Sequence, residues 1–205
     1  MKLNAVIVFV KNPELGKVKT RLASTIGAEY ALKVYSALLH HTQQILVSLP
    51  AHIRVYFSER VELNQGWRSN ECSLLVQRGN HLGERLNNAF RETFQLGYKK
   101  VVVIGSDCLE IRSEHLTSSF EVLSNNDVVI GPTYDGGYYL LGMKQIYPQL
   151  FANKSWSTSE VYPQTLTDIE HIHLSWQALE TLNDIDTYED VIRSPLKVLL
   201  NTSPA

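Results

Sequence analysis

The chain has 205 residues, of which 44 % are hydrophobic and 20 % are charged, as expected for a soluble globular protein with a substantial core. The formal net charge of −2 provides no overall field that would attract nucleic acid or an anionic membrane, so we expect neither partner. Cys72 and Cys108 match no zinc or redox spacing, and the first apolar run, residues 5–10, is too short to span a membrane. We therefore expect a cytoplasmic protein.

In the first half of the chain, short apolar runs alternate with segments in which apolar residues recur at helical spacing. Short runs rich in β-branched residues predict buried strands at residues 5–10, 53–57, 72–76 and 101–104. A first long helix is predicted by the apolar spacing from Ala31 to Leu49, just before Pro50. A second is predicted where Leu82 begins a four-residue apolar repeat that ends near Gly97.

The second half continues the alternation less regularly. We expect a helix at 113–123, strands at 128–130 and 138–143, a helix after Ser157, a strand near 171–174 and a last helix near Thr187. This order predicts one α/β domain over residues 1–205, with a mostly parallel sheet covered by helices on both faces. Such sheets bind ligands beyond the carboxyl ends of their strands, which points to the loops after Val10, Ile104 and Ile130.

The loop after the first predicted strand concentrates positive charge in a chain that is net acidic. Gly16 permits a backbone turn, and Thr20 can begin a helix whose N-terminus favours anions. The pattern predicts a polyphosphate cradle, although a solvated basic loop is the alternative. It is neither a Walker A motif nor a GxGxxG motif, which argues against a P-loop NTPase and a dinucleotide-binding dehydrogenase. The candidate nucleotide and phosphate ligands here are Lys11, Gly16, Lys17, Lys19 and Arg21.

Asp107 lies just past the end of the predicted strand at 101–104, the clearest buried strand in the sequence, where Gly105 allows a sharp turn. A carboxylate at this position can hold Mg²⁺ or Mn²⁺, which prefer oxygen ligands. Such an ion would neutralise phosphate charge as a leaving group departs. The alternative is that Asp107 caps the next helix. We interpret Cys108 as a small buried residue and not as a nucleophile.

Three further segments carry candidate site residues. Asp135 precedes Gly136, Gly137 and Tyr138 in a tight turn; it can serve as a base, a metal ligand or a sugar-hydroxyl acceptor, or the segment can be a plain hairpin. We assign its last three residues to the acceptor side. Arg85 follows Gly83 in the first turn of a predicted helix, where a cation is unfavourable unless an anion offsets it. Asp184 and Asp186 can supply a second metal ligand, for which we choose Asp186, or can begin the last helix.

In this order, the motifs resemble a bacterial family of GT-A-like proteins that are described as nucleotide-diphospho-sugar-transferase-like, or as radical-SAM- and seleno-domain-associated transferases. The resemblance runs over about residues 4–193. It implies a Rossmann-like GT-A fold, a nucleotide site lined by the first loop and a divalent metal at Asp107. The chain also resembles guanylyltransferases of cofactor biosynthesis. Leu109 stands where the family commonly has proline, but this departure leaves the aspartate in place. The residues that carry the resemblance are Lys11, Pro13, Gly16, Lys17, Lys19, Thr20, Arg21, 82–85, 105–108, 131–132, 135–139, 156–158 and 184–187.

These observations lead us to expect a metal-dependent transferase that uses a nucleotide-activated donor and a small-molecule acceptor. Our first choice is a glycosyltransferase that acts on a nucleotide-diphospho-sugar. One alternative is a guanylyltransferase-like nucleotidyltransferase that takes a nucleoside triphosphate and releases pyrophosphate, and another is a non-catalytic nucleotide-binding protein. We assign catalysis to Asp107 and Asp135, phosphate binding to the first loop with Gly83 and Arg85, and Mg²⁺ or Mn²⁺ to Asp107 and Asp186.

Overall fold

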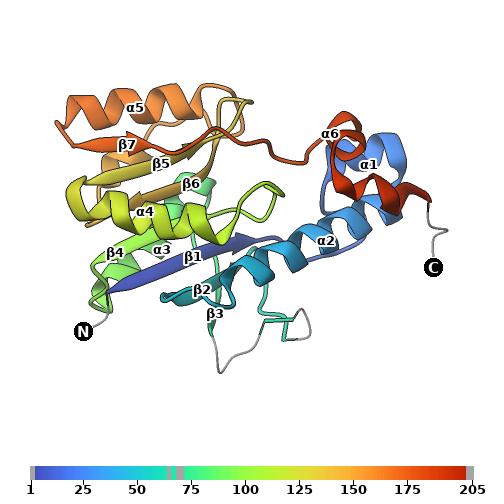
Figure 1. Ribbon diagram of the computed structural model, residues 1–205, viewed down its shortest axis with the longest axis horizontal. Coiled ribbons are helices and arrows are strands. Elements are labelled where there is room, and N and C mark those ends of the chain that lie inside the picture. The colour runs from blue at the N-terminus through green and yellow to red at the C-terminus, as the bar shows by residue number, and fades with distance from the viewer. Residues whose placement is uncertain (1–2, 64–65, 68–71, 202–205) are drawn as a thin grey trace.

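A computed structural model of the protein describes residues 3–63, 66–67 and 72–201 (Figure 1). Strands and helices alternate along most of the chain, as the sequence predicts. The strands are β1 Asn4–Val10, β2 His52–Phe57, β3 Cys72–Val76, β4 Lys100–Ile104, β5 Val128–Pro132, β6 Tyr138–Met143 and β7 Trp176–Ala178. The helices are α1 Thr20–Ile26, α2 Ala28–Leu46, α3 Leu82–Gln95, α4 Ser113–Asn125, α5 Val161–His171 and α6 Tyr188–Arg193, with 3-10 turns η1 Pro148–Phe151 and η2 Pro195–Asn201.

The described strands form one sheet in the order β3-β2-β1-β4-β6-β5-β7. Strand β6 runs antiparallel to β4 and β5, and the other neighbouring strands are parallel. The expected α/β fold with a mostly parallel, Rossmann-like sheet is therefore confirmed. The expectation that residues 1–205 form a single domain stays a prediction.

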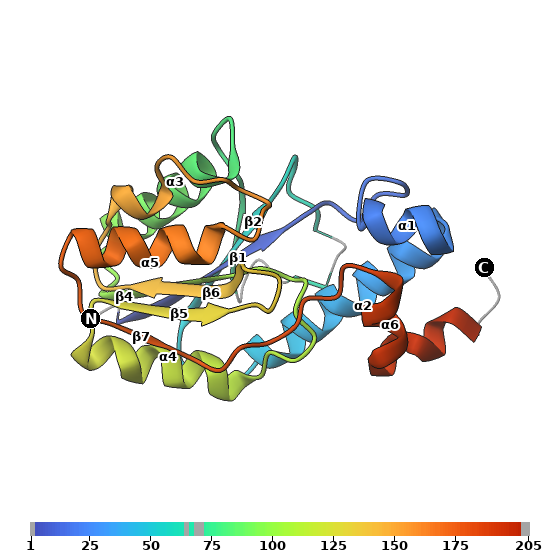
Figure 2. The ribbon, with the colours of Figure 1, turned by 90° about the horizontal axis from the view of Figure 1, so that it is seen from above.

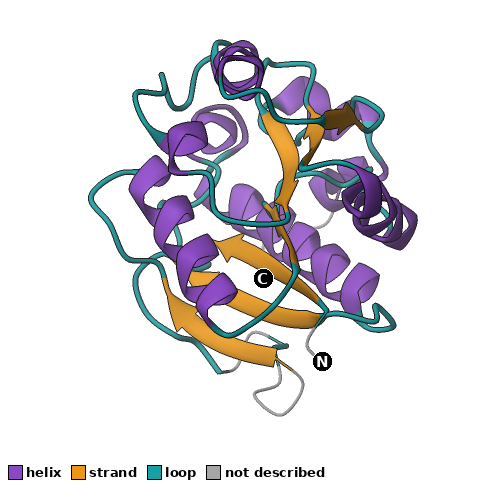
Figure 3. Ribbon diagram, turned by 90° about the vertical axis from the view of Figure 1, so that its left-hand side faces the viewer, coloured by secondary structure: helices purple, strands orange, loops and turns teal. Residues whose placement is uncertain are grey.

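Helices cover both faces of the sheet (Figures 2 and 3). Helices α2 and α4 pack on one face, with Val6 and Val8 of β1 in the same cluster. Helices α3 and α5 pack on the other face, which takes Ala5 and Ile7. Because all four of these strand residues are fully buried, the continuous apolar run that predicted β1 reflects burial on both sides.

A third, smaller cluster joins α1, α2 and α6 at one end of the molecule (Figure 1). Gly27, with φ +84°, separates α1 from α2, so the segment before the first long helix is itself helical. Helix α6 begins after Thr187, whose hydroxyl accepts from the backbone N–H of Asp190. This confirms the predicted last helix. No helix of the described chain is long and apolar enough to cross a membrane.

The strand predicted near residues 171–174 is wrong. Helix α5 continues to His171, and the strand lies a few residues later at β7. The apolar side chains of Ile172 and Leu174 pack against the same core cluster as α5, and His173 takes φ +55° to end the helix. The apolar alternation that indicated a strand is therefore the end of a helix and the turn that follows it.

Candidate functional site

A cavity of about 710 Å³ lies at the carboxyl ends of β1 and β4, at the edge of the sheet that the sequence indicated. The loops after these strands, the β5–β6 hairpin, the first turn of α3, the loop before α5 and the segment before α6 all contribute to its walls. Of the predicted site residues, those that line it are Lys11, Arg21, Arg85, Asp107, Asp135, Gly137, Tyr138 and Asp186. A second cavity, of about 450 Å³, lies between η1 and α5 and contains none of them.

Backbone pairing brings Asp107 next to the acids near residue 185. The N–H of Ile185 donates to the carbonyl of Asp107 at 2.9 Å, and Cys108 forms a β-bridge with Asp184. Residues 76 and 78 positions apart in the sequence are thus fixed at one place, which brings both aspartates that flank Ile185 to Asp107. The alternative that Asp107 caps a helix does not hold, because α4 begins at Ser113 and its N-cap is Arg112.

Asp186 also lies outside the helix that follows it. The capping box of α6 is formed by Thr187 and Asp190, and the Asp190 carboxylate accepts from the backbone N–H of Asp186. The side chain of Asp186 is therefore left to point toward α1, where Arg21 approaches it at 3.4 Å. This pair is exposed on the Arg21 side, so its contribution to stability is small.

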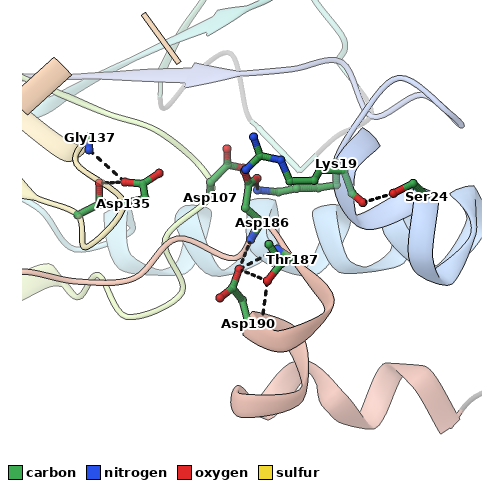
Figure 4. Close-up of polar contacts among 10 residues, drawn as sticks. Lys19, Ser24, Asp107, Asp135, Gly137, Asp186, Thr187 and Asp190 are labelled. Atoms are coloured by element: carbon green, nitrogen blue, oxygen red, sulfur yellow. Dashed lines mark hydrogen bonds and ion pairs between the residues drawn. The ribbon is translucent and has the colours of Figure 1, made fainter. Parts of the chain in front are cut away.

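Lys19 joins the two carboxylates (Figure 4). Its ammonium lies 2.8 Å from Asp107 Oδ1 and 3.3 Å from Asp186 Oδ1, and its side chain is only 3 % exposed. Burial by itself would lower the pKa of Lys19, but the carboxylates of Asp107, Asp186 and Asp184 together raise it. The predicted phosphate ligand and the two predicted metal ligands are thus held in one cluster.

Asp184 completes this cluster. The residue as a whole is half-buried and lines the cavity. Burial, with the nearby charges of Asp107, Asp135 and Asp186, raises the pKa of Asp184 to about 7, against the effect of Lys19. A carboxyl with this pKa can gain or lose a proton near neutral pH. Sequence reasoning considered it only as one of an alternating pair, because the neighbours that shift its pKa come from distant parts of the chain.

Asp135 sits in the turn between the antiparallel strands β5 and β6, so the predicted turn is confirmed, while the role of Asp135 stays a prediction. Its Oδ1 accepts from the Thr133 hydroxyl and from the N–H of Gly137, which holds the carboxylate in place at the cavity wall. Gly136 has φ +88°, and a Cβ there would lie 2.2 Å from the carbonyl oxygen of Ser159. Glycine is therefore required at this position so that the loop before α5 can pack over the turn.

Lys17 and Gly16 lie away from the cavity. The Lys17 ammonium pairs with Glu14 at 2.6 Å and is 58 % exposed, and Gly16 provides a positive φ for the turn. The loop is instead anchored by Asn12, which sequence reasoning missed. Its amide oxygen accepts from the backbone N–H of Glu59 at 3.0 Å, and its amide nitrogen donates to the carbonyl of Arg60 at 2.9 Å. No sequence pattern distinguishes an asparagine that links two loops.

Two predicted site residues lie in the first turn of α3. Gly83 is needed for packing, and Arg85 lines the cavity. A Cβ on Gly83 would lie 2.4 Å from the carbonyl oxygen of Phe151 and 2.7 Å from Trp156 Nε1, so this glycine admits the indole against the helix. Arg85 lines the cavity, and its Nε donates to the carbonyl of Gly79 at 3.0 Å. Within the described chain, no carboxylate pairs with its guanidinium, which leaves that cation available to an anion in the cavity.

Aromatic side chains form the wall next to Arg85. Trp156 and Tyr138 both line the cavity and pack against the core cluster beneath α3. The phenolic oxygen of Tyr138 is buried and has no hydrogen-bond partner among the described residues. A buried hydroxyl without a partner is unfavourable.

The sequence matches the family described as "Uncharacterized protein conserved in bacteria (DUF2064)" over residues 37–158, more than half of the chain. The chain belongs to this family. It is 30 % identical to a proposed nucleotide-diphospho-sugar transferase from Desulfovibrio desulfuricans G20, whose crystal structure superposes with a TM-score of 0.86 over 98 % of this chain and 95 % of that one. This agreement confirms the expected GT-A-like transferase fold.

Two other similarities extend the comparison. The chain is 25 % identical over 138 residues to the 2-phospho-L-lactate guanylyltransferase of Methanocaldococcus jannaschii; this covers 67 % of the chain but only 59 % of the relative. A 4-diphosphocytidyl-2C-methyl-D-erythritol synthase from Anaerococcus prevotii shares the fold, with a TM-score of 0.61 over 96 % of this chain and 98 % of that one, at 10 % identity. The protein is thus a homologue of transferases.

Proposed function

We propose that this protein is a metal-dependent transferase that uses a nucleotide-activated donor. The observation that carries the proposal is the cluster at the strand ends. Two aspartates from distant segments, Asp107 and Asp186, line a cavity large enough for a nucleotide. Both meet one buried lysine, Lys19, which lies behind the residues that line this cavity. Opposite charges brought together at the ligand-binding edge of such a sheet are suited to a metal and a polyphosphate.

The chemistry of the donor set fits a hard divalent cation. Among the described residues, no three His, Cys, Asp or Glu side chains are grouped so as to hold a metal ion. Two carboxylates nevertheless already share one positive charge, and Mg²⁺ commonly takes one or two carboxylates with phosphate oxygens and water. Asp107 and Asp186 would hold Mg²⁺ or Mn²⁺, which when bound would neutralise phosphate charge.

In this proposal the chain acts mainly by holding and orienting charged groups. Lys11 and Arg21, with Lys19, bind the phosphates of the donor. Asp135, with Oδ1 fixed by the turn, accepts the proton of the attacking acceptor group through its other oxygen. Gly137, Tyr138 and Trp156 form the wall against which the acceptor lies.

Nucleotidyl transfer is the first of two candidate reactions. The support for it is the guanylyltransferase relative, and the leaving group would be pyrophosphate. Glycosyl transfer is the second candidate, favoured by the proposed sugar transferase that matches almost the whole chain; its leaving group would be a nucleoside diphosphate. Incubation with Mn²⁺, nucleoside triphosphates, sugar nucleotides and a pool of small hydroxy acids and phosphates separates them, because only the first releases pyrophosphate.

The metal assignment is tested by Asp107→Asn, which keeps the shape of the side chain and removes its charge. If the ion supplies several kcal/mol of charge stabilisation, turnover falls about 100-fold or more. The matched control is Asp127→Asn, at an acid that pairs with Lys144 on another part of the sheet and does not line the cavity. Equal Mn²⁺-dependent activity in Asp107→Asn and the control would refute the assignment.

A further inference from the structure

The ammonium of Lys19 lies where a bound cation would meet Asp107 and Asp186. It is within 3.3 Å of an oxygen of each carboxylate, and its side chain is almost fully buried. A small polar pocket that is already neutralised by an internal cation binds a second cation less well, because the two positive charges repel at short range. A divalent ion that takes Oδ1 of both Asp107 and Asp186 must therefore displace Lys19.

The backbone at Lys19 shows that this arrangement is imposed. The residue takes φ 47° and ψ 46°, the left-handed region that residues other than glycine, asparagine and aspartate rarely adopt. Strain of this kind persists only where the surroundings over-determine it, and it is concentrated at functional sites. At Lys19 the strained residue is also the N-cap of α1, so its side chain is directed from the start of the helix to the two aspartates.

A free divalent ion and a metal–nucleotide complex differ in what they offer this lysine. Displacement by the free ion leaves a buried ammonium without its partners, which is costly. A polyphosphate that arrives with the ion offers the ammonium new oxygen partners, so the cost is offset. Lys11 and Arg21 also line the cavity and provide further cations for those phosphates.

We infer that the site takes its divalent ion as a complex with the nucleotide phosphates and that Lys19 excludes the free ion. This inference rests on the proposed function and adds the form in which the metal enters. On binding, Lys19 exchanges two carboxylates for phosphate oxygens, and the carboxylates exchange the ammonium for the ion. Each of these charged groups therefore has a partner of opposite charge both before and after the exchange.

The competing explanation is that Lys19 is a permanent structural counter-ion. In that case Asp107 and Asp186 never release it, and its removal leaves two like charges that destabilise the fold without creating a metal site. The two explanations differ in what the full-length protein does with Mn²⁺ alone, before any nucleotide is added.

The experiment measures Mn²⁺ binding by the loss of the free-ion electron paramagnetic resonance signal, for the wild type, Lys19→Met and Lys19→Gly. Methionine removes the charge at similar length, and glycine also relieves the positive φ, so at least one variant is expected to fold. We expect both to bind free Mn²⁺ about 10- to 100-fold more tightly than the wild type, the range by which neighbouring groups tune metal sites. With GTP present, and after subtraction of the Mn²⁺ that GTP binds in a protein-free sample, we expect the wild type to bind Mn²⁺ more tightly than it does without GTP.

The matched control is Lys154→Met, at a lysine that is equally buried and paired with Asp168 in the other cavity. Its Mn²⁺ affinity should equal that of the wild type. The inference is overturned if the Lys19 variants bind free Mn²⁺ no better than the wild type, or if Lys154→Met gains as much as they do. If the Lys19 variants gain affinity while no nucleotide affects the wild type, the exclusion of the free ion stands and the proposed donor class fails.

Discussion

At the scale of single residues, the titration of Asp184 makes the stability of the metal-free protein depend on pH. Its carboxyl has a pKa of about 7 in the folded chain, against about 3.9 for an unfolded aspartate. Between these values the folded state holds the proton and the unfolded state does not, so stability decreases as pH rises through this window. We expect the melting temperature in EDTA to be lower at pH 8 than at pH 6.

The variant that isolates this effect is Asp184→Asn, which imitates the protonated carboxyl. Its melting temperature in EDTA should change less between pH 6 and pH 8 than that of the wild type, and should exceed it at pH 8. Asp127→Asn serves as the comparison, because hydrogen bonds from Ser175 keep the pKa of Asp127 below its ordinary value and its titration falls below this range. A wild-type profile that is flat, or that rises, from pH 6 to pH 8 would contradict the assignment.

At the scale of elements, Tyr35 of α2 connects the two loops that form the site. Its hydroxyl accepts from the backbone N–H of Lys11 at 2.7 Å and from the Ser106 hydroxyl at 3.4 Å, and donates to the Lys11 carbonyl at 3.0 Å. The single donor and both acceptor positions of a phenol are thus in use. We expect Tyr35→Phe to lower the free energy of unfolding by about 1–3 kcal/mol, because it leaves buried polar groups without hydrogen-bond partners. We also expect it to raise the KM for the nucleotide, because the loop at Lys11 loses the hydrogen bonds that hold it.

The control for Tyr35→Phe is Tyr56→Phe. Tyr56 is equally buried, and its hydroxyl bonds to Arg54 at 3.0 Å and Glu92 at 3.2 Å, but it does not line the cavity. It should lose stability without a change in nucleotide KM. Denaturant unfolding gives the stability of both variants, and initial rates give their KM for the nucleotide. Equal KM values for Tyr35→Phe and Tyr56→Phe would show that the Tyr35 hydroxyl is structural only.

The elements also show how far the sequence could be read. Strand β4 was predictable because a short continuous apolar run is buried most simply as a strand with both faces covered. Helix α3 was predictable because apolar residues that repeat every four positions lie on one face of a helix. The end of α5 was not, since Ile172 and Leu174 are apolar for a reason that lies in the neighbouring core cluster. In the same way, the composition of the first loop indicated an anion site but did not separate Lys19, which reaches Asp107, from Lys17, which pairs with Glu14.

At the scale of the whole molecule, the site depends on the return of the chain to its starting loop. After β7 the segment crosses the strand ends: Leu179 donates to Ile130 at 2.8 Å, Leu182 to Pro132 at 3.1 Å and Ile185 to Asp107 at 2.9 Å (Figure 1). It ends at α6, which packs with α1 and α2. The contact between Asp186 and Lys19, 167 residues apart, therefore depends on the path of this segment across the ends of β4 and β5.

A ligand that bridges these segments binds the folded state and not the unfolded chain. At about 100 times its dissociation constant, such a ligand stabilises a protein by roughly 2.7 kcal/mol, and for a chain of this size each kcal/mol raises the melting temperature by about 2–4 °C. We therefore expect Mn²⁺ with the correct nucleotide to raise the melting temperature of the wild type by roughly 5–10 °C, as measured by thermal shift. The corresponding nucleoside has no phosphates for the cations at the strand ends and should produce no shift, and Asp107→Asn should respond to neither. If the nucleoside stabilises as much as the nucleotide, the cavity recognises the base without the metal and phosphates, and the charge cluster at Lys19 is not the binding site.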